Sequence, residues 1–184
     1  MGYAGWKEPQ INAALPHVLN LAIASGEDLK SVSDIVTDAM TGFGLKATDS
    51  VTALDKFGQK VSVNAVEHFS DIMTAMSTNA NTTVGMAGES AKYAGSVVGA
   101  MYSSQSAQDK MNAFSDWAII EGLMANAGLK GSMAGTAQRA LLTRFASLQQ
   151  NAKAARSTLG IEMTYQDSGY DNEGLYHEAG QTRR

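Results

Sequence analysis

Apolar residues recur along most of the chain at steps of three and four, which is the spacing of one buried face of an α-helix. Ahead of residue 128 these steps link Ala113, Trp117, Ile120, Met124 and Ala127. Strict alternation, the pattern of a strand, is confined to one short segment near the end. We therefore predict an all-α fold, a compact multi-helix domain with αα-hairpins and at most a short C-terminal β-hairpin.

The first helices are expected over residues 8–15 and 17–24. Pro16 is placed in the first turn of the second helix, where its missing N–H costs nothing. Gly26 closes that helix, because glycine adopts the left-handed conformation cheaply. Asp28 opens the third helix, where its charge suits the positive N-terminal end.

A fourth helix is expected from Thr48 to about Gly58, with its inward face formed by Val51, Leu54 and Phe57. A fifth begins at Ser62 or Asn64. Its inward face is formed by Val66, Phe69, Met73 and Met76. The polar residues Asn81 and Thr82 then break the pattern as helix caps.

Residues 84–101 are helical in pattern but rich in glycine, which costs roughly 1 kcal/mol for each glycine in a helix interior. The glycines indicate either close packing against a neighbouring helix or marginal stability. Further helices are expected over 133–148 and 150–158, and a strand over 161–165 with a turn at 167–169. The predicted helical domain spans 5–165, and 166–184 form a polar, disordered tail.

The stretch 122–137 predicts a tight corner between two helices. Gly128 supplies a left-handed helix end, and Leu129 folds back on the last turn. Ser132 caps the next helix. Gly131 ends the tight Gly-Leu-Lys-Gly corner. In the first turns of the next helix, Ala134, Gly135 and Ala137 leave little side-chain bulk, so that two helix backbones approach closely. A phosphate-binding loop is excluded, because that motif needs Gly-Lys followed directly by Ser or Thr after a strand.

Candidate chemistry is sparse. The chain has no cysteine, which excludes disulfides and thiolate metal sites. Glu67, His68 and Asp71 offer a metal two or three ligands, but no further cluster accompanies them, and His17 and His177 lie elsewhere. We therefore predict no catalytic residue, no metal and no cofactor, and a protein that is not an enzyme.

The net charge of −4 is unevenly distributed. Residues 122–161 contain no acid and five basic residues, namely Lys130, Arg139, Arg144, Lys153 and Arg156. This block faces an anion such as DNA, the acidic part of its own chain, or solvent. Phe145 is the one aromatic residue among its basic residues, which is too few for stacking along a strand, so we expect no specific nucleic acid partner. The start of the chain shows no signal peptide, and no stretch approaches the ~20 apolar residues that cross a bilayer.

The order of these segments resembles the core region of tail tape measure proteins of tailed bacteriophages, in the phage minor tail protein family. The resemblance spans about residues 5–165 and includes Gly5-Trp6-Lys7, Phe43-Gly44-Leu45 and Asn79-Ala80-Asn81-Thr82. The other matching stretches are 15–22, 24–29, 33–39, 92–93 and the corner at 122–137. Residues 51–65 look inserted, the segment between Tyr93 and Gly122 is longer than the family pattern, and the chain stops where the family continues.

The resemblance implies a structural role: such proteins template tail length, fill the tail tube during assembly and leave it ahead of DNA ejection. It implies contacts with tail tube, tail assembly chaperone and distal tail proteins, in the host cytoplasm during assembly and then in the tail lumen. The chain itself is expected to be the core segment or a truncated prophage remnant, able to self-associate. Two alternatives remain: a stand-alone helical interaction module, and a membrane-active protein suggested by the spacing of Gly95 and Gly99.

Overall fold

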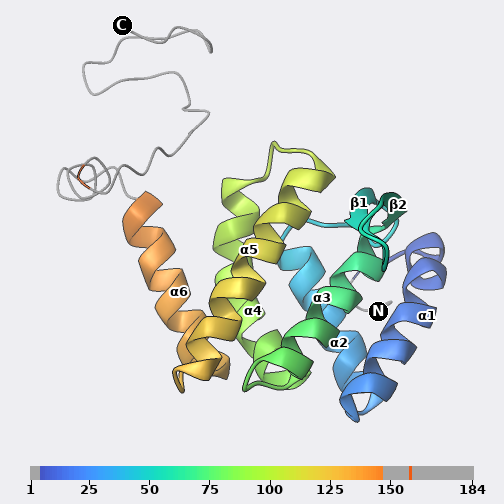
Figure 1. Ribbon diagram of the computed structural model, residues 1–184. Coiled ribbons are helices and arrows are strands. Elements are labelled where there is room, and N and C mark those ends of the chain that lie inside the picture. Colours follow the sequence, from blue (N-terminus) through green and yellow to red (C-terminus); the bar gives the residue numbers. More distant parts are fainter. Residues whose placement is uncertain (1–4, 147–157, 159–184) are drawn as a thin grey trace, which may run out of the picture. The chain divides into compact units, whose positions relative to one another are not determined.

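The computed structural model describes residues 5–146 and 158, and all packing discussed below lies within 5–143. The elements, in chain order, are α1 (Glu8–Ser25), α2 (Leu29–Gly42), β1 (Ser50–Leu54), β2 (Lys60–Asn64), α3 (Ala65–Asn79), α4 (Val84–Met101), α5 (Ala107–Asn126) and α6 (Gly131–Ala146) (Figure 1). The prediction of a mainly α-helical domain is confirmed. The strand predicted at 161–165, the turn after it and the polar tail lie outside the described residues, as does the helix expected at 150–158 apart from Thr158.

The first helix is continuous, so the prediction of two short helices meeting at Pro16 is wrong. Pro9, rather than Pro16, occupies the first turn. Pro16 lies inside α1 and leaves the carbonyl of Asn12 without its usual intrahelical partner. Both residues are on the exposed side of the helix, where water can take that bond, and so the helix continues.

The helix predicted between Thr48 and Gly58 is also wrong, because this segment forms an antiparallel hairpin. Ser50 lies opposite Asn64, and Leu54 lies opposite Lys60. β-branched residues, adjacent in β1 (Val51 and Thr52) and alternating in β2, favour the pleated conformation, in which one face can be half-buried. Of the three residues expected to face inward, only Val51 is buried; Leu54 and Phe57 are 67% and 75% exposed.

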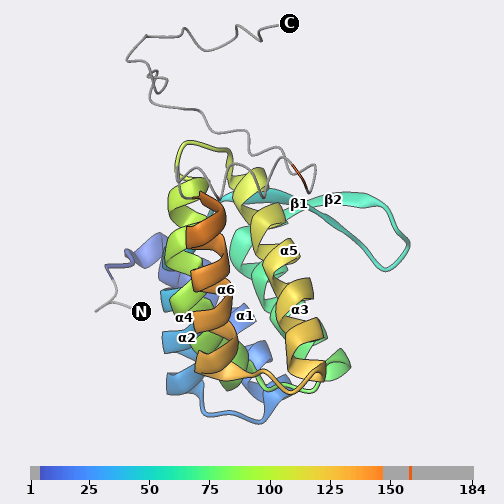
Figure 2. The same ribbon diagram turned by 90° about the vertical axis from the view of Figure 1, so that its left-hand side faces the viewer.

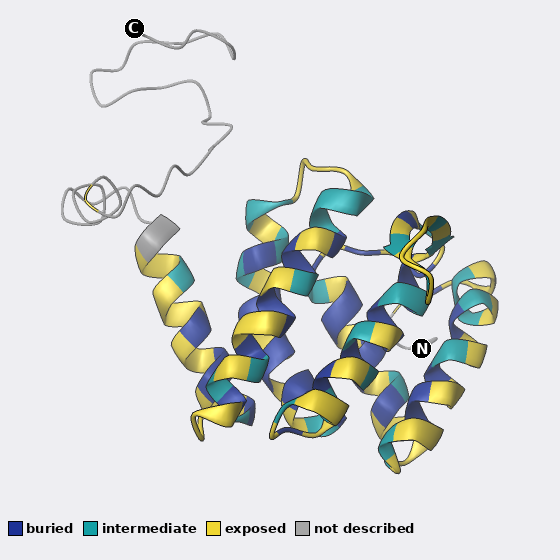
Figure 3. Ribbon diagram, viewed as in Figure 1, coloured by how far each residue is buried: buried dark blue, intermediate teal, exposed yellow. Residues whose placement is uncertain are grey.

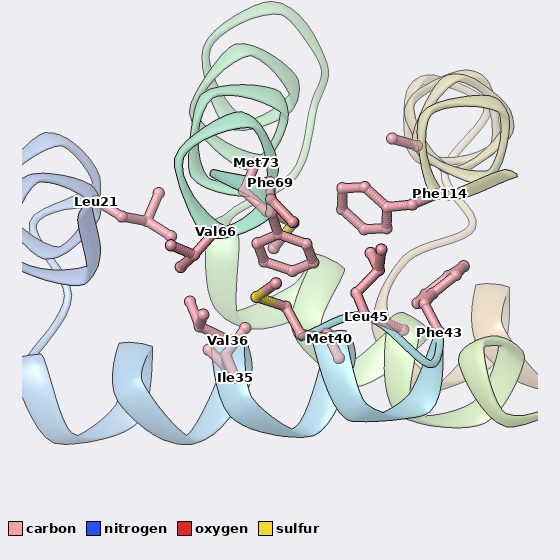
Figure 4. Packing of buried hydrophobic residues seen from close by; sticks show 14 of the residues in the cluster. Leu21, Ile35, Val36, Met40, Phe43, Leu45, Val66, Phe69, Met73 and Phe114 are labelled. Atoms are coloured by element: carbon pink, nitrogen blue, oxygen red, sulfur yellow. The ribbon is translucent and has the colours of Figure 1, made fainter. Parts of the chain in front are cut away.

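The core is centred on an aromatic cluster contributed by the end of α2, α3 and α5. The ring of Phe114 stacks on Phe69 with centroids 4.3 Å apart and meets Phe43 edge-on at 5.1 Å. Figure 4 shows Phe43, Phe69 and Phe114 converging from three elements, with Met40 and Met73 beside them. The predicted α3 face is confirmed, because all four of its residues are buried: Val66, Phe69, Met73 and Met76.

The glycines of α4 seat this helix directly against α2. A Cβ atom on Gly88 would come within 2.5 Å of the Ile35 side chain, and one on Gly95 within 3.0 Å of the Phe43 ring. A Cβ on Gly99 would overlap the carbonyl oxygen of Gly42. Of the two readings of this glycine-rich helix, close packing against a neighbour is therefore the one that the structure shows.

Candidate functional site

The corner between α5 and α6 has the hydrogen bonds of a Schellman motif. Gly128 has φ +91° and donates its N–H to the carbonyl of Ala125 at 3.1 Å. The next N–H, from Leu129, bonds to the carbonyl of Met124 at 2.9 Å. These two bonds satisfy carbonyls that the end of α5 would otherwise leave free, and they turn the chain back toward α4 and α5.

The first turns of α6 rest on α4. Gly131 has φ +59°, is buried and already belongs to α6. Ser132 therefore lies inside the first turn, and the prediction that it caps the helix from outside is wrong. A Cβ on Gly135 would come within 2.5 Å of the backbone oxygen of Ser90. The absence of side-chain bulk at this position is what allows the two helix backbones to meet.

A buried carboxyl group joins the three helices of this junction. Glu121 of α5 has no exposed surface. Its Oε2 atom accepts a hydrogen bond from the hydroxyl of Ser90 on α4 at 2.6 Å, and a second from Nε2 of Gln138 on α6, also at 2.6 Å. The Glu121 side chain is therefore a three-helix joint, and Figure 2 shows α6 lying in front of the α4–α5 pair that it connects.

The environment of Glu121 favours its neutral form. Burial raises the pKa of the Glu121 carboxyl, and the hydrogen bonds from Ser90 and Gln138 lower it by less. Its second oxygen, Oε1, is buried without a hydrogen-bond partner. All three side chains are buried and closed to a substrate, so the cluster holds helices together and has no access for catalysis.

The sequence pattern missed this joint because it identified only part of the buried face of α5. Ile120 and Ala127, predicted to be buried, are exposed. Ala113 and Trp117 are buried as predicted, and the buried face also contains Phe114, Ala118 and Glu121. The spacing along the helix could have indicated that Glu121 is buried. Glu121 lies four residues after Trp117 and four before Ala125, both of which are buried.

The predicted helix ends are placed as follows. Gly26 has φ +70° and ends α1 with a bond from its N–H to the Ala22 carbonyl. Asp28 precedes α2, and its carboxylate accepts the N–H groups of Lys30 and Ser31 at 3.0 and 3.1 Å. The hydrogen bonds that the Ser31 hydroxyl and then the Ser31 N–H donate to the Asp28 carboxylate are the largest causes that lower the pKa of Asp28.

The cap of α4 differs from the prediction. Thr83 takes that position, and its hydroxyl oxygen accepts the N–H of Met86 at 3.2 Å. Asn81 and Thr82 were expected to cap the helix. They lie two residues and one residue before the capping position, which is Thr83. Asn81 instead donates its N–H to the side chain of Asn126 at the end of α5, at 2.8 Å.

Metal ligands do not gather in the part of the chain that the structure describes: no group of three His, Cys, Asp or Glu side chains there is placed to hold an ion. Burial lowers the pKa of His68, against the smaller opposing effects of Asp71 and Glu67. Among the described helices none is both long enough and apolar enough to cross a membrane. Of the basic block, Arg139 is exposed, while Lys153 and Arg156 lie outside the described residues.

Comparison with known proteins decides the family. The model of the phage-related minor tail protein family matches residues 1–175. The chain belongs to this family. The resemblance drawn from the sequence is thereby confirmed, and membership supports a structural role for this minor tail protein in a phage tail.

A relative gives the scale of the match. The tape measure protein of Pneumococcus phage Dp-1 is 29% identical over 171 residues, which are 93% of this minor tail protein and 12% of the phage Dp-1 protein. The chain thus spans about an eighth of that relative's length. No solved structure matches it.

Proposed function

We propose that this chain is a folded core segment of a tail tape measure that acts in tail assembly, length determination and DNA ejection through protein–protein contacts. The observation that carries the proposal is the family match over residues 1–175, together with the similarity to a tape measure protein across 93% of the chain. The family match covers the helical unit and the corner at 122–137.

The folded unit would contribute little to the ruler itself. Its longest described helix has 20 residues, or about 30 Å at ~1.5 Å per residue. Its helices fold back on one another rather than extend. We therefore assign it the role of a docking module, whose contacts place the rest of a tape measure, rather than that of a length-encoding rod.

The partners we propose are the tail tube, the tail assembly chaperone and the distal tail proteins. The chain would meet them in the host cytoplasm during assembly and remain in the tail lumen of the virion. The proposed role is non-enzymatic. It is supported by the family and by the enclosed position of Ser90 and Glu121, which keeps these polar groups away from any substrate.

The two alternatives fare differently. A stand-alone module that binds tail or chaperone proteins would use the same surfaces, and only its independence from a longer tape measure would distinguish it. The membrane-active alternative rested on Gly95 and Gly99. The structure uses both glycines to seat α4 against α2, which accounts for their spacing without a bilayer.

The test uses the phage genome that encodes the chain, with Gly135→Val to disrupt the α4–α6 contact and Gly122→Ala as the matched control. We expect peptides of the chain in purified tails by mass spectrometry. We expect Gly135→Val to lower the yield of complete tails without shortening those that form, as measured by electron microscopy. Tails that lack the chain, or normal yields with Gly135→Val, would contradict the docking role; a change in tail length would show that the segment measures.

A further inference from the structure

The β1–β2 hairpin is an arm that leaves the helical body. Figure 2 shows its far end standing clear of α3 and α5. Its base is anchored, because Val51 is buried and the N–H of Thr52 donates to Oε1 of Gln108 on α5 at 2.6 Å. The arm is therefore fixed at one end and free at the other.

The tip of this arm is held in one shape by Asp55. Its Oδ1 atom accepts the N–H groups of both Phe57 and Gln59, each at 2.8 Å. The backbone of Asp55 also bonds to Gln59 and Gly58, at 2.9 Å in both cases, and Gly58 turns with φ +75°. A loop ordered in this way loses little conformational entropy when it binds, which is a property of preorganised binding surfaces.

What the tip presents is apolar and basic. Phe57 and Leu54 are the exposed apolar side chains there, and Phe57 is the most exposed large apolar residue in the described part of the chain, at 75%. Nζ of Lys56 lies 5.2 Å from the centre of its ring, and Lys60 is exposed on β2. The carboxylate of Asp55 is occupied by the loop, so the tip suits an apolar surface bordered by an acid.

The outer face of α5 is a surface of that kind. Ile119, Ile120 and Leu123 are 63%, 48% and 66% exposed. They lie on the side of the helix opposite the aromatic core. Asp116, which is exposed, lies one turn before Ile119 and Ile120 on the same face. Exposed aliphatic side chains gathered in this way are typical of protein interaction sites.

We propose that the hairpin tip of one copy docks on the outer face of α5 of a second copy, with Phe57 and Leu54 on the three aliphatic side chains and Lys56 near Asp116. Among the residues that the structure describes, nothing from the same copy covers either surface, so each is available to another molecule. The contact is head-to-tail, since each copy carries both halves, and such contacts form rings or open chains. This inference stands apart from the tail role, because it concerns copies of the purified chain alone.

Sedimentation of the full chain over a range of concentrations tests the proposal. We expect reversible association, weakened about ten-fold or more by Phe57→Ser and by Leu123→Ser. Ile23→Ser is the matched control, because Ile23 is an equally exposed aliphatic residue on α1, at 71%. We expect it to leave association unchanged. All three positions are exposed, and circular dichroism checks that each variant is folded.

A mixture of Phe57→Ser and Leu123→Ser distinguishes this head-to-tail contact from a symmetric contact, in which both copies would use the same surface. Phe57→Ser retains the α5 surface and Leu123→Ser retains the tip, so an equimolar mixture is expected to form pairs but nothing larger. Lys56→Glu and Asp116→Lys should each weaken association, and the double variant should restore it. Three results would overturn the proposal: a monomer at all concentrations, a loss of association with Ile23→Ser equal to that with Phe57→Ser, or an equimolar mixture that forms no pairs.

Discussion

The α-carbon of Gly99 faces the carbonyl group of Gly42 so closely that a Cβ atom on Gly99 would overlap its oxygen and lie 3.1 Å from its carbon. The obstacle is backbone, at the last residue of α2, and it cannot rotate away as a side chain would. The distance between α2 and α4 is therefore set by main-chain contact. Both helices carry buried residues, coloured dark blue in Figure 3.

We predict that Gly99→Ala destabilises the fold by about 1–3 kcal/mol, because the added methyl group forces α2 and α4 apart. Gly122→Ala is the control, since its Cβ would meet only the Ala80 methyl group at 3.4 Å. For Gly122→Ala we expect the unfolding free energy to stay unchanged or to rise by up to about 1 kcal/mol, because alanine has the higher helix propensity. Chemical denaturation measures both; equal effects would mean that α2 and α4 are not in backbone contact.

We predict that Gly128→Val costs more stability than Gly128→Ala. Nothing lies within 4 Å of a Cβ at this position, so the cost comes from the left-handed backbone alone. That conformation costs most non-glycine residues about 1–2 kcal/mol, and branched side chains more. Thermal unfolding of both variants checks the order. An unchanged melting temperature for Gly128→Val would show that the corner does not hold this conformation.

We predict that Glu121 makes the fold less stable as the pH rises. A carboxyl whose folded pKa lies above its ordinary value of 4.5 contributes stability that is full below that value and is lost as the pH rises through the folded pKa. Glu121→Gln keeps an oxygen that can accept from Ser90 and Gln138 but does not titrate. The unfolding free energy of the native chain minus that of the variant should therefore fall as the pH rises above about 4.5.

Glu89→Gln on exposed α4 surface is the control for this series, because it removes one glutamate charge without entering the joint. The difference in unfolding free energy between the native chain and Glu89→Gln should vary less with pH than the difference between the native chain and Glu121→Gln. A Glu121→Gln difference that stays constant, or grows with rising pH, would show that the carboxyl is not stabilised in its neutral form.

We predict that the purified chain does not hydrolyse peptidoglycan. The described part of the chain has no gathered metal ligands, and its buried Ser90 and Glu121 are closed to a polymer substrate. A zymogram with lysozyme as the positive control measures this directly. A cleared band at the position of the chain would contradict the non-enzymatic role.

Sequence periodicity was most informative where a helix has one apolar face and no competing pattern. The bounds of α4 agree with the predicted 84–101, and the α3 face is as expected. The hairpin was missed because Val51, Leu54 and Phe57 are spaced by three, as on a helix, while Asp55 and Gly58 form the turn between strands. Local spacing alone could not decide between the two.

The joint at Glu121 could not be predicted from a single helix. A charged residue inside an apolar pattern is normally taken as exposed, and the partners that make its burial acceptable come from α4 and α6. Ser90 lies 31 residues earlier and Gln138 lies 17 residues later in the chain. Only the folded arrangement of three helices brings them together. The same reason explains why Ile120 was assigned to the buried face.

The manner in which α6 is seated has a mechanical consequence. Within the described unit its seat includes small residues, such as Gly135 against Ser90, the partly buried Leu142, and a side-chain hydrogen bond from Gln138 to Glu121. A load pulling on α6 would thus act on these few contacts first, because α6 contributes no ring to the aromatic cluster of α2, α3 and α5. Under tension the unit would yield in a fixed order, with α6 peeling away first and the remaining helices holding.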